Sequence, residues 1–204
     1  MPPIPELEAI RKAQILEAGL VTISEKGIAK TTLDDVCRAA GLSKGGLVHY
    51  FKTKDQLFKA VFAVFFQRIF QRGKETMETF ETPLAQILSY DWLYDEANDD
   101  VYKGYPLLLD LFAQAAFDGE CRFMIQDWIQ SWVDLLSQPL KQGIAQGIFS
   151  PMDVPRVARS ISAVYQGVAT RWYLGGDNHS SDWAVETFNR GIMGVLSPYL
   201  NQSA

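Results

Sequence analysis

Several residue types and patterns that mark large functional classes are scarce in this sequence. It holds two cysteines, Cys37 and Cys121, and two histidines in 204 residues. This excludes a disulfide scaffold and offers no ligand cluster for a metal. No apolar run approaches the roughly 20 residues of a membrane span. The stretch 1–6 lacks the regions of a signal peptide. We therefore expect a cytoplasmic protein with no metal, no cofactor and no membrane partner.

Basic residues are also scarce after residue 75. Residues 1–75 hold 12 Lys and Arg against 8 Asp and Glu, a net charge of +4. Residues 76–204 hold 7 against 16, a net charge of −9. This segregation suits a DNA-facing head on an acidic body. On charge alone, the alternative that one end is merely less acidic stays open.

Residues 31–58 carry the most specific pattern in the chain. Thr31 and Thr32 can cap a short helix, and Gly41 supplies the residue that most easily takes the left-handed turn after it. Ser43 can cap a second helix over 44–51, and Thr53 with Gln56 forms a capping box for a third. This order of parts predicts a helix-turn-helix DNA reader.

These residues resemble the TetR family of bacterial transcriptional regulators. The matching segments are Ile15–Ala18, Ser24–Gly27, Thr31–Thr32, Ala39–Gly45, Leu47, His49–Phe51, Lys54 and Leu57. The resemblance implies an all-helical homodimer with an N-terminal DNA-binding domain and a larger C-terminal domain for effector and dimer contacts. One position departs from the family, which usually has an aromatic residue where this chain has Val48. Val48 could instead touch a thymine methyl group.

The expected DNA contacts gather at helix starts. Two glycines leave the second helix of the motif without bulk at its N-terminal end, and Lys44 there can reach a guanine or a phosphate. Hydroxyls at helix starts favour phosphate, and the resemblance implies further contacts. The candidates are Thr32, Ser43, Lys44, Gly45, Gly46, Val48, His49, Tyr50 and Lys54. For Tyr50, core packing beside Phe51 is an equal alternative, and Phe51 and Leu47 are assigned to the core.

The rest of the chain shows helical periodicity and no sustained period of two, so we expect an all-α fold of about nine helices. The first helix should cover 5–26 and end at Gly27. The domains should be 1–53, for DNA binding, and 54–204, for effector and dimer contacts, with the helix 54–79 as connector. A fifth helix should run from Thr82 to about Ala97, and Pro139 should kink the seventh helix without ending it.

Two apolar stripes near the C-terminus indicate a dimer interface. Paired with their copies, the last two helices would make a four-helix bundle across a two-fold axis. The stripe residues are Val157, Ile161, Val164, Val168, Val185, Phe188, Ile192, Val195 and Tyr199. Beside them runs a strip of small residues, Ser160, Ala163 and Gly167. The alternative is that these stripes only close the core of one chain.

The C-terminal part is rich in aromatic residues, which suit a small-molecule pocket. The candidates for its wall are Trp92, Tyr105, Phe112, Trp128, Trp132, Tyr165 and Trp172. Large residues at helical spacing also suit a core, which stays the alternative. Asp110 and Asp127 are candidates to face a bound cation, and only Arg122 and Arg171 lie close to the aromatic stripes. We therefore expect a small apolar, neutral or cationic effector.

The function expected from these features is a ligand-responsive, homodimeric regulator, a repressor released from a palindromic double-stranded operator by its effector. One alternative is a DNA-binding protein of the same fold that acts without a small effector. Another is a hydrolase, because residues 41–45 match the G-x-S-x-G pattern. That pattern needs a strand leading into the serine, whereas here a helix is expected to lead into Ser43.

Overall fold

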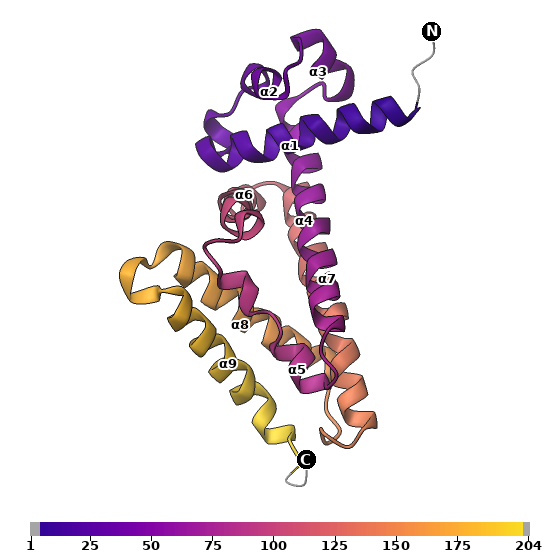
Figure 1. The fold of residues 1–204 in the computed structure, drawn as a ribbon, viewed down its shortest axis with the longest axis vertical. Helices are drawn as coiled ribbons and strands as arrows, with labels where there is room; N and C mark the ends of the chain where they lie inside the picture. Colours follow the sequence, from indigo (N-terminus) through magenta and orange to yellow (C-terminus); the bar gives the residue numbers. More distant parts are fainter. Residues whose placement is uncertain (1–4, 202–204) are drawn as a thin grey trace. The chain divides into compact units, whose positions relative to one another are not determined.

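The computed structural model describes residues 5–201 and is all-helical over that range, which confirms the expected fold class (Figure 1). The helices are α1 (Pro5–Lys30), α2 (Leu33–Ala40), α3 (Lys44–Tyr50), α4 (Lys54–Glu78), α5 (Pro83–Leu88), α6 (Asp99–Ala115), α7 (Gly119–Ala145), α8 (Val154–Leu174) and α9 (Ser181–Leu196), with 3-10 helices at Asp91–Tyr94, Gly176–His179 and Ser197–Tyr199. Residues 1–4, part of the stretch without a signal-peptide pattern, lie outside the described range. No helix within that range is long and apolar enough to cross a membrane.

The predicted caps of the helix-turn-helix are confirmed. The Thr32 hydroxyl accepts a hydrogen bond from the Asp35 backbone N–H at 3.1 Å, and the Asp35 carboxylate accepts one from the Thr32 N–H at 3.0 Å. Gly41 takes the left-handed conformation, with φ 64° and ψ 34°. The Ser43 hydroxyl then accepts from the Gly46 N–H at 3.2 Å. These bonds satisfy backbone groups that a helix end leaves without partners.

The described chain forms two compact units. The head unit contains the residues up to Ile69 together with Tyr102–Arg122, and the body unit contains Phe70–Val101 and the residues from Phe123 on. The helices α4, α6 and α7 each contribute residues to both units. This division by contacts differs from the expected boundary between residues 53 and 54. That boundary separates roles in the molecule, and it stays a prediction.

In the head unit, α2 and α3 lie next to each other on one side of α1 (Figure 1). Its core is apolar, with Ile15, Val36, Leu47 and Phe58 fully buried. The first helix passes beyond its predicted end, because a further helical turn follows the break at Gly27 (φ 75°, ψ 157°) and reaches Lys30.

In the body unit, α8 and α9 run side by side as a helical hairpin (Figure 1). A glycine permits their close approach, since a Cβ atom on Gly191 would lie 2.8 Å from a methyl group of Val164. The helix α7 continues through Pro139 to Ala145, as predicted.

The predicted fifth helix is too long. The helix α5 ends at Leu88, and a separate 3-10 helix covers Asp91–Tyr94. Local side chains compete with the helical backbone here: the Ser89 hydroxyl donates to the Gln86 carbonyl at 2.8 Å, and the Asp91 carboxylate accepts from the Trp92 N–H at 2.9 Å. Such bonds offer the backbone an alternative to the helical ladder.

Candidate functional site

The N-terminal end of α3 is exposed and free of bulk. A Cβ atom on Gly45 would meet nothing within 4 Å, and one on Gly46 would meet only the Ser43 hydroxyl at 3.4 Å. Beside them, the Lys44 side chain is 68% exposed, and its ammonium lies 3.1 Å from the Asp34 carboxylate. An exposed pair of this kind contributes about 0–1 kcal/mol. The ammonium can therefore exchange this partner for a phosphate at little cost.

In the next turn of α3, some side chains point into the core and others are exposed. Leu47 and Phe51 are buried, as predicted. Val48 is 38% exposed, and the His49 Nε2 atom lies 4.0 Å from a Glu8 carboxylate oxygen. Tyr50 is half-buried, with its ring edge-on to His49 at 5.2 Å between centroids. The exposed face of α3 thus carries Val48 and His49, and Tyr50 lies at its border.

Thr32 is occupied by its cap. Its hydroxyl and its N–H both donate to the Asp35 carboxylate, at 2.7 and 3.0 Å. The Thr32 hydroxyl, followed by the ammonium of Lys26 at 2.9 Å, lowers the pKa of Asp35 well below its usual range. The structure thus gives Thr32 a role in holding α2, and its phosphate contact stays a prediction.

Lys54 has intramolecular partners as well. Its ammonium donates to the carbonyls of Ile28 and Ala29, at 2.6 and 3.3 Å. On the other side of the same residue, the Ile28 N–H donates to the Asp110 carboxylate of α6 at 2.6 Å. The last turn of α1, which follows the break at Gly27, is therefore held between the start of α4 and α6. This corrects the expectation for Asp110, whose carboxylate serves a backbone amide of the head unit.

Two further charged residues have structural roles. Arg122 donates to the carbonyls of Ala115 and Ala116 at the end of α6, at 3.2 and 3.1 Å. Arg171 donates to the Gly167 carbonyl one turn earlier in α8, at 3.1 Å. Arg122 thus satisfies carbonyls at the end of α6, and Arg171, in the last turn of α8, opposes the negative end of the helix dipole.

Both cysteines are buried and free. Burial, followed by the neighbouring Asp118, raises the pKa of Cys121 to about 11, so this thiol stays protonated at neutral pH. Nearby, the Lys59 ammonium donates to the carboxylates of Glu120 and Asp55, and these bonds, that to Glu120 first, raise the pKa of Lys59. Lys59 thus forms an ion pair between α4 and the start of α7 in the head unit, with carboxylates that are exposed to solvent.

The expected effector residues belong to both units, and their role in one pocket stays a prediction. Tyr105 and Phe112 belong to the head unit, and the other five belong to the body unit. In the body unit, the Trp132 and Tyr165 rings pack edge-to-face at 5.6 Å, and Tyr90 contacts both at 5.5 and 5.3 Å. The Tyr165 hydroxyl donates to the Ile87 carbonyl at 2.7 Å, and burial raises its pKa. Trp132 and Tyr165 are therefore part of a packed aromatic core.

Two side chains beside this core, those of Arg72 and Asn98, were not among the residues predicted from the sequence. Arg72 of α4 places its guanidinium carbon 4.8 Å from the centroid of the Trp92 ring, and it donates to the Asn98 side-chain carbonyl at 2.8 Å. A signal was present, because Arg72 follows the buried Ile69 by three positions and Phe65 by seven. This spacing places the arginine on the inward face of the helix.

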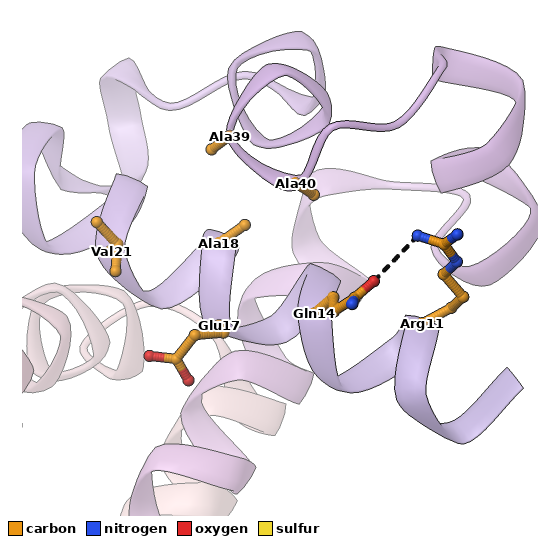
Figure 2. Close-up of a pocket in the computed structure, with 7 residues that line it drawn as sticks. All are labelled: Arg11, Gln14, Glu17, Ala18, Val21, Ala39 and Ala40. Atoms are coloured by element: carbon orange, nitrogen blue, oxygen red, sulfur yellow. Dashed lines mark hydrogen bonds between the residues drawn. The ribbon is translucent and has the colours of Figure 1, made fainter. Parts of the chain in front are cut away.

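A groove that the sequence does not predict lies in the head unit, between α1 and α2 (Figure 2). It has a volume of about 500 Å³ and is open to solvent. Its lining residues are Arg11, Gln14, Glu17, Ala18, Val21, Ala39 and Ala40. Arg11 donates to the side chain of Gln14 at 3.1 Å, as Figure 2 shows. The groove has no aromatic wall and does not match the expected effector site.

The predicted dimer stripes are largely internal. Five of the nine residues are buried in the single chain, namely Val157, Ile161, Val168, Phe188 and Ile192. This corrects their assignment, because a side chain buried in one chain makes its contacts there. Val164, Val185, Val195 and Tyr199 are partly exposed, and their role in an interface stays a prediction. The small residues Ser160 and Ala163 are exposed on α8, as is Gly194 on α9.

Comparison with known proteins identifies the motif and the helical body. The family model of bacterial regulatory proteins of the tetR family matches residues 15–61, and that of the C-terminal region of BetI-type transcriptional repressors matches residues 105–197. The chain belongs to the tetR family of bacterial regulatory proteins. The first match includes every predicted DNA-contact residue, and the second includes all of α8 and α9.

Curated TetR-family relatives match over part of their length. The HTH-type transcriptional repressor KstR2 from Mycolicibacterium smegmatis is 29% identical over 86 residues, which cover 42% of this chain and 42% of the relative. The HTH-type transcriptional regulator BetI from Paraburkholderia xenovorans is 44% identical over 54 residues, or 26% of this chain and 28% of the relative. The chain thus spans less than half of each of these relatives.

Solved structures match over nearly the whole chain. One described as a transcriptional regulator from Saccharomonospora viridis, in complex with choline, has a TM-score of 0.82 at 16% identity and covers 95% of this chain and 100% of that chain. A structure from Rhodococcus sp., described as a TetR-family transcriptional regulator, has a TM-score of 0.78 at 22% identity and covers 91% of this chain and 98% of the other. At these identities the likeness shows the shared fold alone.

Proposed function

We propose that this TetR-family chain is a ligand-responsive transcriptional repressor that binds a palindromic operator in double-stranded DNA as a cytoplasmic homodimer. The observation that carries the proposal is the N-terminal end of α3, where a capped helix presents Lys44 and two glycines without bulk. A recognition helix contacts base edges through its N-terminal residues. The match of the C-terminal region to BetI-type transcriptional repressors supports the sign of regulation.

In the proposed complex, Lys44 contacts a guanine or a phosphate, and the backbone at Gly45 and Gly46 approaches the groove floor. Val48 and His49 follow on the exposed face and reach base edges or the backbone. Ser43, Thr32 and Tyr50 complete the proposed contacts at the borders of this surface, and Lys54 supports it by holding the last turn of α1, with a phosphate contact as the alternative. Their hydroxyls and the Lys54 ammonium approach phosphate only where their intramolecular bonds leave a donor free.

Selection of DNA from a random pool with the full chain tests this proposal. We expect a palindrome whose half-sites are about 34–36 Å apart, one helical turn, because two recognition helices of a symmetric dimer read one face of the duplex. Enrichment of no sequence above background would contradict it. The operator so found is then the probe for every DNA measurement below.

We propose that the homodimer forms through the exposed side of the α8–α9 hairpin. Ser160, Ala163 and Gly194 present small side chains there, and small residues let helices approach closely. The partly exposed Val164 and Val195 would lie beside them. Two such hairpins would form the four-helix bundle expected from the sequence.

The proposed effector is a small molecule bound by the body unit and expected to be apolar, neutral or cationic. The choline in the Saccharomonospora viridis complex favours a cation. The guanidinium of Arg72 opposes one at Trp92, because it already occupies a position near that ring. Binding would change the separation of the two recognition helices through α4, α6 and α7, which have residues in both units. Titration of tryptophan emission, paired with operator release, tests this. If the chain binds its operator but no small molecule changes its tryptophan emission or releases the operator, regulation without a small effector is favoured.

The chain is also proposed to have no catalytic activity. The Ser43 hydroxyl caps α3, and the helix α2 precedes it where a nucleophile elbow needs a strand. An esterase assay on the intact chain against Ser43→Ala tests this. Activity that disappears in the variant would support the hydrolase alternative.

A further inference from the structure

In the body unit, a group of hydrogen-bond donors surrounds Arg72 without enough acceptors. The Arg72 guanidinium carries five N–H bonds. One of its nitrogens, Nη1, donates to the Asn98 Oδ1 atom at 2.8 Å, and its carbon stands 4.8 Å from the Trp92 ring centroid. Among the residues that the structure describes, no carboxylate lies within ion-pair distance of Arg72. This half-buried cation therefore has no counter-charge beside it.

Asn98 adds donors to this group. Its side chain is buried, with 7% of the residue exposed. Because Arg72 donates to its Oδ1 atom, the orientation of the amide is fixed and its NH2 group is the end left over. That Nδ2 atom is buried and has no hydrogen-bond partner. A buried donor without an acceptor lowers the stability of the fold.

Trp92 contributes the third donor. Its indole Nε1 atom is also buried without a partner. Arg and Trp side chains carry no acceptor, so Asn98 Oδ1 is the single acceptor of these three side chains, and it already accepts from Arg72. The positive charge of Arg72 and the free N–H groups of Asn98 and Trp92 would be satisfied by a group with hydrogen-bond acceptors and negative charge. A carboxylate has both.

The residues around these donors indicate what kind of molecule would carry the carboxylate. Tyr90, which is fully buried, lies 6.4 Å from Trp92 and 5.5 Å from Trp132 between ring centroids. The donors thus adjoin the aromatic core. Two carboxylates close in sequence have other partners: Asp91 accepts from the Trp92 backbone N–H, Asp95 accepts from the Ala97 N–H, and both are exposed.

We propose that Arg72, Asn98 and Trp92 form the acceptor-binding end of the effector site, which takes an apolar or aromatic molecule that carries a carboxylate. This refinement rests on the proposed ligand-responsive function. It replaces the cationic alternative at this position, because Arg72 already places a cation on the Trp92 ring.

The test is calorimetric binding to the full-length protein without DNA, with two matched probe series. Octanoate and 3-phenylpropionate are compared with their amides and with the corresponding amines. We expect each carboxylate to bind about tenfold or more tightly than its amide, and the amines to bind more weakly still. Equal affinities within a series, or no binding by either carboxylate at millimolar concentration, would overturn the proposal.

Three variants locate the binding site. Asn98→Asp keeps the acceptor for Arg72, but it replaces the free NH2 with negative charge. It should form an ion pair with Arg72, raise the melting temperature and lose carboxylate binding. Arg72→Gln should remove the preference for carboxylate over amide. The control is Arg190→Gln, which removes an exposed arginine that pairs with Glu186 on α9 and should change nothing. Unchanged carboxylate affinity in Asn98→Asp and Arg72→Gln would show the site to be wrong.

Operator release is measured separately with the same probes. Carboxylate binding that depends on Arg72 but leaves the operator bound supports the site and contradicts its role in regulation. Failure of the chain to bind any operator contradicts the proposed function alone, because the calorimetric result does not depend on DNA.

Discussion

Lys44 and Lys54 stand at the starts of two consecutive helices, yet their ammonium groups have different partners. That of Lys44 meets an exposed carboxylate, and that of Lys54 meets two backbone carbonyls of α1. Salt dependence separates these roles. A lysine that neutralises a phosphate releases a counterion, and a lysine that holds the protein does not.

Lys44→Ala should weaken operator binding by about tenfold and reduce the slope of log affinity against log salt by about one unit. Fluorescence anisotropy at several salt concentrations measures both quantities. Lys141→Ala, at an exposed position on α7, is the control and should leave them unchanged. An unaltered salt slope in Lys44→Ala would remove its phosphate contact from the proposal.

Lys54→Ala should also weaken operator binding, since the Ile28 carbonyl loses a charge-assisted bond of about 1.5 kcal/mol or more and the last turn of α1 loosens. We expect the salt slope to stay close to that of the wild type and Lys54→Arg to restore part of the affinity. A slope reduced by about one unit would instead show a phosphate contact by Lys54, as the family resemblance implies.

At the scale of elements, local signals are reliable where a helix end is decided by neighbours in sequence. Thr32 with Asp35, Gly41, and Ser43 with Gly46 act over three residues or fewer, and their caps were predicted correctly. The end of α5 was missed because Ser89 and Asp91 were not weighed against the helical pattern.

Contacts between residues far apart in the chain could not be predicted from the sequence. Arg72 and Asn98 are 26 residues apart, and Ile28 and Asp110 are 82 apart. Periodicity places each side chain on a face of its helix but does not pair the faces. The same limit applies to α8 and α9, where a stripe of valines and isoleucines reads alike whether it closes the core or meets a second chain.

The joint between α6 and the last turn of α1 yields a prediction at this scale. Asp110→Ala would leave the Ile28 N–H without its acceptor, and we expect a loss of about 1–3 kcal/mol in the free energy of unfolding. Asp110→Asn keeps an acceptor oxygen and should lose less. Thermal unfolding followed by circular dichroism measures the difference. The exposed Asp127→Ala is the control. Equal stability of Asp110→Ala and the wild type would show that this bond contributes nothing to the fold.

At the scale of the whole molecule, residues 1–75 carry a net positive charge and residues 76–204 a net negative charge, so DNA would be attracted to the N-terminal part of the chain. Reading a palindrome, however, requires two heads at a fixed separation. In the proposed dimer, the affinity for DNA would therefore depend on the exposed side of the α8–α9 hairpin as well as on α3. This surface offers small residues with exposed arginines one turn away, Arg156, Arg159 and Arg190, while five of the nine apolar stripe residues of the same helices are buried in the chain.

Ala163→Glu tests this interface without disturbing the core. The exposed position tolerates glutamate in a single chain, but the charge would be desolvated between two hairpins, at a cost of several kcal/mol unless it finds a partner. We expect sedimentation to show monomers at micromolar concentration, unchanged helicity, and much weaker operator binding. Ala113→Glu, the same change at an exposed position of α6, is the matched control and should stay dimeric. Ile192→Asp does not serve this purpose, because Ile192 is fully buried and its loss would unfold the chain itself. A stable Ala163→Glu dimer would place the interface elsewhere on the chain.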